Sequence, residues 1–423
     1  MKILALSNLY PPDYIGGYEV ACKQAVDALR ALGHDVRVVT TAPRTPVPHI
    51  PHVRRVWQMT DVYNGYLGAR NRPVTAYLEQ AESSMVNAFN VHALAREIED
   101  FQPDAAYVHN IVAVGGIGVM ATLQHMGVPW VWQLGDEIPV TICRIMGQVH
   151  KQLCGEFNRQ LDGEFQACSR QLVDEVEAGG VRLRDRVEIF PNWVVGEKPP
   201  ARERYYRPGQ TLRIASAGSI SSSKGVDLLI EGAALLRELG HDDFQVDIYG
   251  KVEDQAFPTM VHRFGLHDHV HFRGFKPQAE LQDSYRDYDT FAFPTWQREP
   301  FGLVPLEAAW RGCVPLISHT CGISEWLVHG VHCVKIQRSA RGVAEALASI
   351  MEGRIDLEPI GRRAAAVVER DFHIDALSPR IERALARAAA KPRRGAGTAA
   401  EAYRLALLAE KLAKVLIQEA IPA

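Results

Sequence analysis

The 423-residue sequence lacks several features that would place it in a common class of protein. It has no long basic run, and 47 Lys and Arg against 50 Asp and Glu leave a net charge of -3, so a nucleic-acid partner is not expected. No stretch approaches about eighteen uncharged apolar residues, and the apolar start of the chain is soon interrupted by polar residues. Neither a membrane span nor a signal peptide is therefore expected.

The seven cysteines form no C-x-x-C pair, and their number is odd. A zinc site and a disulfide framework are both disfavoured by this pattern, which is typical of buried thiols in a cytoplasmic protein. The remaining composition, 47% hydrophobic over 423 residues, is that of a globular chain too long for one compact core. We therefore expect two domains of an α/β protein.

The stretch from Thr290 to Ser318 predicts a strand, a polar loop, a helix and a second strand in fewer than thirty residues. Pro300 and Gly302 disfavour regular helix, whereas Pro305 is tolerated only in a first helical turn. The helix should therefore begin near Leu303.

Two carboxylates and a set of free backbone N–H groups should meet at the start of this helix. Glu299 precedes it, Glu307 lies about one turn inside, and the N–H groups of Phe301, Gly302 and Leu303 have no partner within the helix. Helix N-terminal amides favour anionic oxygen and glutamates favour hydroxyls, so this arrangement suits a ligand that carries both phosphate and sugar hydroxyls. Two glutamates eight residues apart are otherwise most often surface charges.

The segment Glu299-Pro-Phe-Gly-Leu-Val-Pro-Leu-Glu307 resembles the E-x7-E signature of retaining GT-B glycosyltransferases, and most of all glycosyltransferase family 4. The resemblance covers most of residues 1–375. It implies two Rossmann-like doubly wound domains that face a cleft. It also implies that Glu299 touches the donor sugar, that the amides of 301–303 hold sugar and phosphate, and that Glu307 binds the ribose.

The N-terminal half offers three more candidates. Gly16 and Gly17 lie where a loop after a strand (2–7) meets a helix, and the resemblance places such a pair against the donor diphosphate and acceptor. His109 ends another strand, where a lone histidine is most often structural, but the resemblance places it near the donor sugar. Asp136 follows a further strand and either contacts an acceptor hydroxyl or caps the next helix, with the cap slightly favoured.

The second domain should open with a strand over 212–217, followed by a serine-rich loop and then Lys224. Lys224 matches the family's lysine in G-R-x-x-x-x-K-G and would stabilise the leaving phosphate. Ser219 stands where the family has arginine, so half of the cationic clamp is missing unless Arg298 or another cation supplies it. The Asp287-Tyr-Asp289 segment imitates a D-x-D metal motif, but it directly precedes a strand and favours a structural role.

We expect the domains to comprise residues 1–195 (acceptor domain) and 211–380 (donor domain), joined by an exposed linker, 196–210. Residues 381–423 should form C-terminal helices that return to the first domain. Within them, Ala399 to Gln418 carries leucines along one side, with packing as its expected role, since membrane docking would call for a wider or more basic face. An amphipathic helix is expected over 341–370. The segment 42–100 is expected to be an irregular excursion, and acceptor recognition and a solvated insertion are equally favoured as its role.

The resulting hypothesis is a retaining glycosyltransferase that moves a sugar from a nucleoside diphosphate to a small-molecule or glycan acceptor, with no metal or other cofactor. His109, Lys224 and Glu299 are its expected catalytic residues. A catalytically silent nucleotide-sugar-binding partner, a GT-B epimerase and a phosphorylase are the alternatives. The sequence leaves the base, the sugar, the acceptor, peripheral membrane contact and the oligomeric state open.

Overall fold

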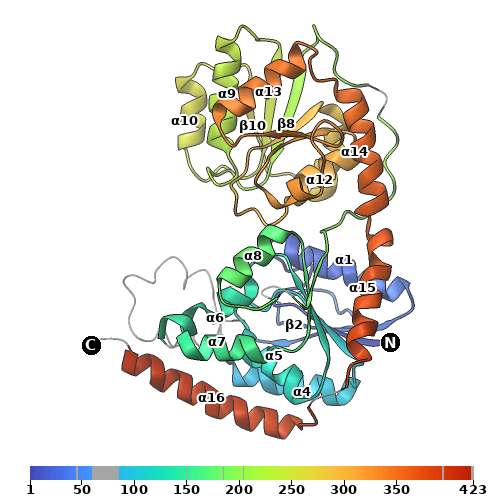
Figure 1. Ribbon diagram of the computed structural model, residues 1–423, viewed down its shortest axis with the longest axis vertical. Helices are drawn as coiled ribbons and strands as arrows, with labels where there is room; N and C mark the ends of the chain where they lie inside the picture. The colour runs from blue at the N-terminus through green and yellow to red at the C-terminus, as the bar shows by residue number, and fades with distance from the viewer. Residues whose placement is uncertain are drawn as a thin grey trace. The chain divides into compact units, whose positions relative to one another are not determined.

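The structure is a computed structural model, and it forms two compact units (Figure 1). Unit 1 comprises Met1–Phe190 and Leu377–Ala423, and unit 2 comprises Pro191–Ala376. The helix α15 (Ile374–Ala389) includes the boundary at Leu377. The structure describes residues 1–43, 46–59, 85–149, 151–183, 185–202, 204–392 and 395–420, without the side chains of 144–149, 151–154, 156 and 416–420.

Unit 1 is built on a parallel sheet whose seven described strands lie in the order β3-β2-β1-β4-β5-β6-β7. The strands are β1 (Lys2–Leu6), β2 (Asp35–Thr41), β3 (Val53–Trp57), β4 (Ala105–Val108), β5 (Trp130–Leu134), β6 (Glu164–Ala167) and β7 (Val187–Ile189). The helices are α1 (Gly17–Ala31), α4 (Ala88–Phe101), α5 (Gly116–His125), α6 (Ile138–Val149), α7 (Lys151–Gln160), α8 (Arg170–Ala178) and α16 (Ala399–Ala420). Strands β1 and β4 are almost wholly buried, as central strands of a parallel sheet must be.

Unit 2 repeats this plan with six described parallel strands in the order β10-β9-β8-β11-β12-β13. They are β8 (Leu212–Ala217), β9 (Phe244–Tyr249), β10 (Val270–Gly274), β11 (Thr290–Phe293), β12 (Val314–Ser318) and β13 (Val334–Ile336). The helices are α9 (Val226–Glu238), α10 (Ala256–Arg263), α11 (Gln278–Ser284), α12 (Leu303–Trp310), α13 (Ala340–Met351) and α14 (Leu357–Asp371). Short 3₁₀ turns occupy Tyr285–Asp287 and Gly322–Glu325.

The predicted fold class is confirmed, because each unit is a doubly wound α/β sheet in which helices connect most of the successive parallel strands. The expected unit over Thr290 to Ser318 is present as β11, α12 and β12, and the two strands pair in parallel. In both sheets the chain order reverses beside the first strand of the unit. This point lies between β1 and β4 in unit 1 and between β8 and β11 in unit 2.

Parts of the expected irregular excursion, 42–100, are regular. Val53–Trp57 forms β3 and pairs with β2, and Ala88–Phe101 forms α4. The tryptophan side chain of Trp57 is fully buried and its indole N–H donates to the Asn90 carbonyl at 3.1 Å, while Arg55 donates to the carbonyls of Tyr10 and Pro11. Sequence analysis missed this strand because prolines precede it and two arginines lie within it.

The expected exposed linker, 196–210, instead packs in part against unit 2. Tyr205 and Tyr206 are buried, and Arg202 forms an ion pair of 2.8 Å with Asp289. The composition of 196–210 predicted an exposed segment because proline and charged residues are common in linkers. Two aromatic rings and a paired arginine nevertheless allow part of this segment to pack on the domain surface.

Two expectations about helices are corrected. The expected helix 341–370 is two helices, α13 and α14, because Gly353 adopts a left-handed φ of +76° and Asp356 caps a new start by accepting from the Glu358 N–H at 3.0 Å. Helix α16 does pack on α4, but through Ala399, Ala402 and Ala406, whereas Leu405, Leu408 and Leu412 are exposed. Small side chains let two helix backbones approach closely. A hydrophobicity pattern does not reveal this, because it favours the larger leucines over alanines as the buried residues.

Candidate functional site

The candidate site residues of unit 2 lie in two loops at the carboxyl edge of the sheet, after β8 and after β11. These two strands are the neighbours at which the strand order reverses, where ligands bind in open α/β sheets. The loop after β8 leads through Ser219 to Lys224, and the loop after β11 leads through Glu299 to Gly302. The two loops therefore share the position that the fold provides for a ligand.

Helix α12 begins at Leu303, as the prolines predicted. Gly302 precedes it with a left-handed φ of +103°, a conformation that favours glycine. Within the described residues, the N–H groups of Phe301, Gly302 and Leu303 donate to no protein acceptor. The turn thus presents adjacent free donors at the positive end of a helix, which is an arrangement that suits an anionic oxygen.

Lys224 and Glu299 are brought together at this turn. The Lys224 Nζ forms an ion pair with Oε2 of Glu299, and the side chains are 32% and 11% exposed respectively. The ammonium also lies 5.8 Å from the centre of the Phe293 ring. A partly exposed cation held by one carboxylate remains accessible to a phosphate, since the lysine stem is flexible and has further N–H donors.

The backbones of the two loops are locked together. Gly225, at the start of α9, has a φ of +74°, and a Cβ there would overlap the Pro294 carbonyl. The Ser223 carbonyl accepts from the Trp296 N–H at 2.8 Å and from the Thr295 hydroxyl at 3.3 Å. Lys224 and Glu299 are therefore positioned by a shared backbone frame.

A third segment, after β12, braces the Glu299 loop. The Gly322 N–H donates to the Glu299 carbonyl at 2.9 Å, and the Ile323 N–H donates to the Phe301 carbonyl at 2.6 Å. A Cβ on Gly322 would overlap the Pro300 carbonyl, so the close approach requires glycine. Sequence analysis did not identify this supporting role of Gly322.

Glu307 is only 4% exposed, and two side chains of α11 cover it. The Nε2 groups of Gln278 and Gln282 both donate to its Oε1, at 2.6 and 2.9 Å. Burial raises the pKa of Glu307, and the two amide donors oppose this shift. The i, i+4 spacing of the glutamines could have indicated a shared face, but it did not show what that face contacts.

Ser219 is exposed and leaves its position without a cation, as the sequence showed. One arginine that sequence analysis missed lies at the same loop. Arg338, just after β13, donates through Nη2 to the Ser222 carbonyl at 2.6 Å. Arg298 is placed near the Trp296 ring, at 5.8 Å from its centre. A positive charge therefore lies beside the serine-rich loop, although it comes from an element far away in the sequence.

In unit 1, Gly16 and Gly17 lie at the start of α1, as expected. The Gly16 N–H is already occupied, since it donates to Oε2 of Glu19 at 2.9 Å. The other oxygen of Glu19 accepts from Asn110 Nδ2 at 3.0 Å, and the carboxylate is buried. A Cβ on Gly16 would meet nothing within 4 Å, so there is open space above the glycine but no free amide at that residue.

His109 directly follows β4 and is fully buried. Its ring lies edge-on to those of Tyr18 and Tyr107, with centroids 6.1 and 4.6 Å away, and neither ring nitrogen has a partner within the described residues. Burial lowers the pKa of His109 to about 3, so the ring is neutral near pH 7. His109 is 0% exposed, so a sugar could reach the ring only if the covering residues moved. The expected contact with the donor sugar therefore stays a prediction.

Asp136 is exposed and lies just before α6. Its Oδ1 accepts from the Glu137 N–H at 2.7 Å, and its carbonyl accepts from the Ile138 N–H at 2.8 Å. Both bonds organise the turn that enters the helix, which is close to the favoured capping role. The exposed carboxylate is compatible with an acceptor contact as well, and that role stays a prediction.

The Asp287-Tyr-Asp289 segment has a structural role at its second carboxylate. Asp289 is largely buried, pairs with Arg202 and accepts from the Arg213 N–H at 3.0 Å. Desolvation raises the pKa of Asp289, while the Arg213 N–H and the charge of Arg202 oppose that effect. This carboxylate is therefore committed to the start of β8 and to the segment before it.

Two protein families match most of the chain. Residues 16–193 match the glycosyl transferase 4-like domain, and residues 197–367 match the glycosyl transferases group 1 family. The chain is a glycosyltransferase of the GT-B type. The D-inositol 3-phosphate glycosyltransferase of Arthrobacter sp. (strain FB24) is 24% identical over 83% of this chain and 85% of the relative.

Solved structures share the fold of this glycosyltransferase at low sequence identity. Sucrose-phosphate synthase from Thermosynechococcus elongatus aligns with a TM-score of 0.68 and 16% identity, over 91% of this chain and 98% of that one. Anabaena Alr3699/HepE, in complex with UDP and glucose, aligns with a TM-score of 0.62 and 18% identity, over 92% and 100% of the two chains. At such identities the likeness establishes the fold alone.

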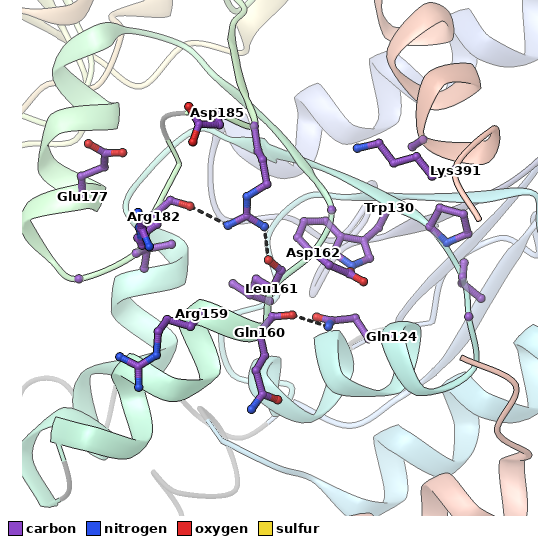
Figure 2. A pocket seen from close by; sticks show the side chains of 18 of the residues that line it. Gln124, Trp130, Arg159, Gln160, Leu161, Asp162, Glu177, Arg182, Asp185 and Lys391 are labelled. Atoms are coloured by element: carbon purple, nitrogen blue, oxygen red, sulfur yellow. Dashed lines mark hydrogen bonds between the residues drawn. The ribbon is translucent and has the colours of Figure 1, made fainter. Parts of the chain in front are cut away.

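A large hollow in unit 1 of the glycosyltransferase lies away from these residues (Figure 2). Its volume is about 1530 Å³, and its walls include residues just before β5, β6 and β7, so it opens at the amino-terminal edge of the sheet. His109 and Asp136 belong to the opposite edge. The Arg186 guanidinium in this hollow donates to the carbonyls of Leu161 and Arg182 and so serves the fold.

Much of the segment 42–100, for which acceptor recognition and a solvated insertion were equally favoured, lies outside the described residues, including Tyr63, Tyr66, Arg70 and Arg72. Acceptor recognition by this segment therefore stays a prediction. Among the described helices, none combines the length and apolar character needed to cross a bilayer.

Proposed function

We propose that this chain is a retaining, family 4 glycosyltransferase that transfers a sugar from a nucleoside diphosphate to an acceptor hydroxyl. The observation that carries the proposal is the start of α12, where three free N–H groups lie in the same turn as the Lys224–Glu299 pair. A diphosphate needs donors and a cation, and a sugar needs a carboxylate. This turn of unit 2 supplies all three.

The residues of unit 2 would divide the donor between them. Lys224 and the amides of Phe301, Gly302 and Leu303 would hold the phosphates, with Arg338 compensating through its charge for the arginine missing at Ser219. Glu299 would accept from hydroxyls of the donor sugar. The known structure with UDP and glucose bound supports a nucleotide-sugar donor, since it shares the fold.

Glu307 would bind the ribose by exchanging partners. In the structure its Oε1 accepts two amide N–H donors, from Gln278 and Gln282. The two adjacent hydroxyls of a ribose are also a pair of donors, and they could replace the glutamine amides without leaving the buried carboxylate unpaired. The covered position of Glu307 then requires the α11 glutamines to turn away when the nucleotide binds.

In the proposed reaction, the bond between the sugar C1 and the phosphate oxygen breaks as the acceptor oxygen bonds to C1 on the same face. The departing phosphate oxygen takes the acceptor proton, so the products are the glycoside and the nucleoside diphosphate. Charge develops on the phosphate, which is why Lys224 and the amides should lower the barrier. Gly16, Gly17 and Asp136 of unit 1 would border the reacting groups, and a contact from His109 requires its covering residues to move.

We further propose that the reaction needs no metal and takes place in the cytoplasm. Asp289 of the D-x-D-like segment is committed to Arg202 and to the Arg213 N–H, and Cys22, Cys313, Cys321 and Cys333 are free thiols in buried positions. Chelation with EDTA should leave the rate unchanged. Loss of activity on chelation and its recovery with manganese would contradict the first part.

The nucleotide site can be tested by thermal unfolding with UDP, GDP and ADP, each compared with its monophosphate. A ligand at 100 times its Kd stabilises the folded state by about 2.7 kcal/mol, a shift of several degrees. One diphosphate should give a shift that its monophosphate does not reach. Absence of a shift with every diphosphate would overturn the proposal, while a shift without turnover would identify a silent nucleotide-binding partner.

Glu307→Gln sharpens this experiment. We expect the variant to bind the preferred diphosphate about tenfold more weakly, the effect of one lost charge-assisted hydrogen bond. The 2′-deoxy nucleotide serves as the matched control, because it should already bind the original protein more weakly and lose little more in the variant. Equal losses for the two nucleotides would place the ribose elsewhere. The anomeric configuration of the first product, read by NMR, tests retention.

A further inference from the structure

Arg311 is a buried arginine that directly follows α12, one helical turn after Glu307. Its side chain is 10% exposed. Within the described residues, its Nε and Nη1 have no hydrogen-bond partner, and its Nη2 donates to Oδ1 of Asp283 at 3.4 Å. The guanidinium also lies 4.9 Å from the centre of the Trp310 ring. A buried cation with unused N–H groups is unusual, because an unpaired buried donor is costly.

Arg311 and Glu307 reach the same stretch of α11. Side chains four residues apart lie side by side on a helix. Gln282 Nε2 donates to Oε1 of Glu307 at 2.9 Å, and the residue after it, Asp283, accepts from Arg311. Burial raises the pKa of Glu307, while the glutamine amides and then the charge of Arg311 oppose that shift. The cation therefore acts on the carboxylate, although no direct ion pair joins these two described side chains.

The charged groups of α11 and of the 3₁₀ turn after it are exposed. The acids of this region are Glu280, Asp283 and Asp287. Arg286 is 44% exposed and lies 3.7 Å from Asp283. Tyr285 is buried, and burial raises the pKa of its hydroxyl, so the group is neutral near pH 7. Water screens exposed charges, so these groups influence a buried carboxylate less than a buried cation does.

The other elements packed against α12 add no competing charge. Strands β11 and β12 contain no charged residue. Burial raises the pKa of the Cys313 thiol, which is therefore neutral near pH 7. Arg363 of α14 donates to backbone carbonyls. Each acid of α14 has a cationic partner, in the pairs Glu358–Arg362, Glu369–Lys198 and Asp371–Arg370. Among the described residues, Arg311 is therefore the buried cation next to Glu307.

A purely structural role accounts for less of this geometry. A cation just after a helix commonly serves the carbonyl groups of the last turn. Within the described residues, the Arg311 side chain donates to no carbonyl, and its one hydrogen bond is to Asp283, which is 65% exposed. An exposed acid at 3.4 Å neutralises little of the charge. Most of the charge of Arg311 therefore remains to act on Glu307.

We propose that Arg311 is a positioning residue for the donor, whose charge keeps Glu307 an ionised, acceptor-only group that can bind both hydroxyls of the ribose. The inference rests on the ribose contact proposed above for Glu307. An ionised carboxylate can accept from both hydroxyls, whereas a protonated one must itself donate from one oxygen. Burial alone favours the protonated form, and a nearby cation offsets that preference. Arg311 keeps its own proton over the whole range of a pH titration.

The test measures the Kd of UDP, GDP or ADP, whichever binds, and of its 2′,3′-dideoxy analogue by calorimetry between about pH 5 and 8.5. The phosphates titrate alike in both ligands, so the ratio of the analogue Kd to the nucleotide Kd reports the ribose contact. In the original protein this ratio should fall about tenfold as the pH drops through the pKa of Glu307. Arg311→Gln should move the midpoint of this fall up by about one pH unit, because the carboxylate loses an opposite charge.

Three further variants separate charge from packing. Arg311→Met replaces the buried stem by an apolar chain and should give the same shift as Arg311→Gln. Arg311→Lys keeps a cation and should leave the midpoint close to that of the original protein. Arg286→Gln is the matched control, since Arg286 is exposed and lies near the same Asp283. It should leave the midpoint unchanged.

The outcomes distinguish this inference from the proposed function. An affinity loss that is equal at every pH in the glutamine and methionine variants would overturn the role of Arg311 and leave the ribose contact of Glu307 intact. An equal shift of the midpoint in the lysine variant or in Arg286→Gln would do the same. A ratio near one at every pH in the original protein would overturn both, because Glu307 would then not bind the ribose.

Discussion

The two points at which the sheets reverse their strand order differ in what their polar groups do. In unit 2, between β8 and β11, Lys224 is partly exposed and the N–H groups at the start of α12 have no described partner. In unit 1, between β1 and β4, the Glu19 carboxylate occupies the Gly16 N–H and His109 is fully buried. The same topology thus presents free, accessible donors in one unit, and a paired amide with a buried histidine in the other.

The difference indicates how the two units share the work. Groups that are already paired gain little from a ligand, whereas free donors and an accessible cation gain a full set of hydrogen bonds. We therefore expect substitutions in unit 2 to affect catalysis most, and substitutions in unit 1 to affect the protein through its fold and its pH dependence.

Among the variants, Lys224→Ala should have the largest effect on activity. A small effect would contradict the difference between the two units. We expect kcat/KM to fall about 10³-fold, because the developing charge on the phosphate loses its cation in a site of low dielectric. Initial rates of nucleoside diphosphate release measure this change. Lys251→Ala is the matched control. Lys251 is an exposed lysine near the same sheet edge, and among the described residues it pairs only with Glu253. An equal loss of kcat/KM in both variants would refute the role of Lys224.

Gly322→Ala should follow, with a loss of about 10² in kcat/KM. The new Cβ would overlap the Pro300 carbonyl and displace the loop that holds Glu299, and a small misplacement of catalytic groups is costly. A fall in the melting temperature should accompany it. Gly155→Ala is the control, because Gly155, like Gly322, has no positive φ, and its Cβ would meet only the Arg159 guanidinium at 3.7 Å. Full activity in Gly322→Ala would show that the brace is dispensable.

His109→Phe tests the buried side of the comparison. Because burial lowers the pKa of His109 to about 3, the neutral ring stabilises the fold above pH 6.5, and this contribution decreases as the pH falls toward 3. The original protein should lose about 1.4 kcal/mol per pH unit below 6.5 from this residue, and the variant should lack that part of the slope in urea unfolding.

The same variant addresses the contact with the sugar. At pH 8, where charge plays no part, a lost hydrogen bond to the donor should lower kcat/KM about tenfold. Unchanged activity with an altered stability slope would assign His109 to the fold alone.

Gly16→Ala should have the smallest effect on stability, and Gly302→Ala should destabilise the protein more. Gly16 has extended backbone and open space for a Cβ, so we expect a change in unfolding free energy within about 0.5 kcal/mol. Gly302 has a φ of +103° and a Cβ would lie 3.0 Å from the Phe293 ring, so a loss of about 1 to 2 kcal/mol is expected. Chemical unfolding measures both, and similar losses would mean that the two helix starts are equivalent.

Local sequence rules predicted the fold class and the start of α12 because these depend on features close together in the chain. Pro300 and Pro305 restrict the backbone directly, Gly302 permits the left-handed turn, and short apolar runs mark central strands of both sheets. The same rules failed where packing decides, as with the alanine face of α16, the paired Arg202 within the expected linker and the strand β3 among prolines.

The support around the candidate site could not be predicted for the same reason. Arg338 meets the Ser222 carbonyl from 116 residues away, and Gly322 meets the Glu299 loop through backbone contact. Gln278 and Gln282 carry no motif at all. Sequence analysis identified residues whose chemistry is visible in their type, and missed residues whose importance comes from what they contact.

The contact of Gly225 with Pro294 limits how this glycosyltransferase can be altered. Because the loop after β8 and the loop after β11 touch backbone to backbone and share the Ser223 carbonyl, neither can be lengthened or exchanged with that of a relative by itself. Grafting experiments that seek a new donor preference should transplant both loops as one cassette.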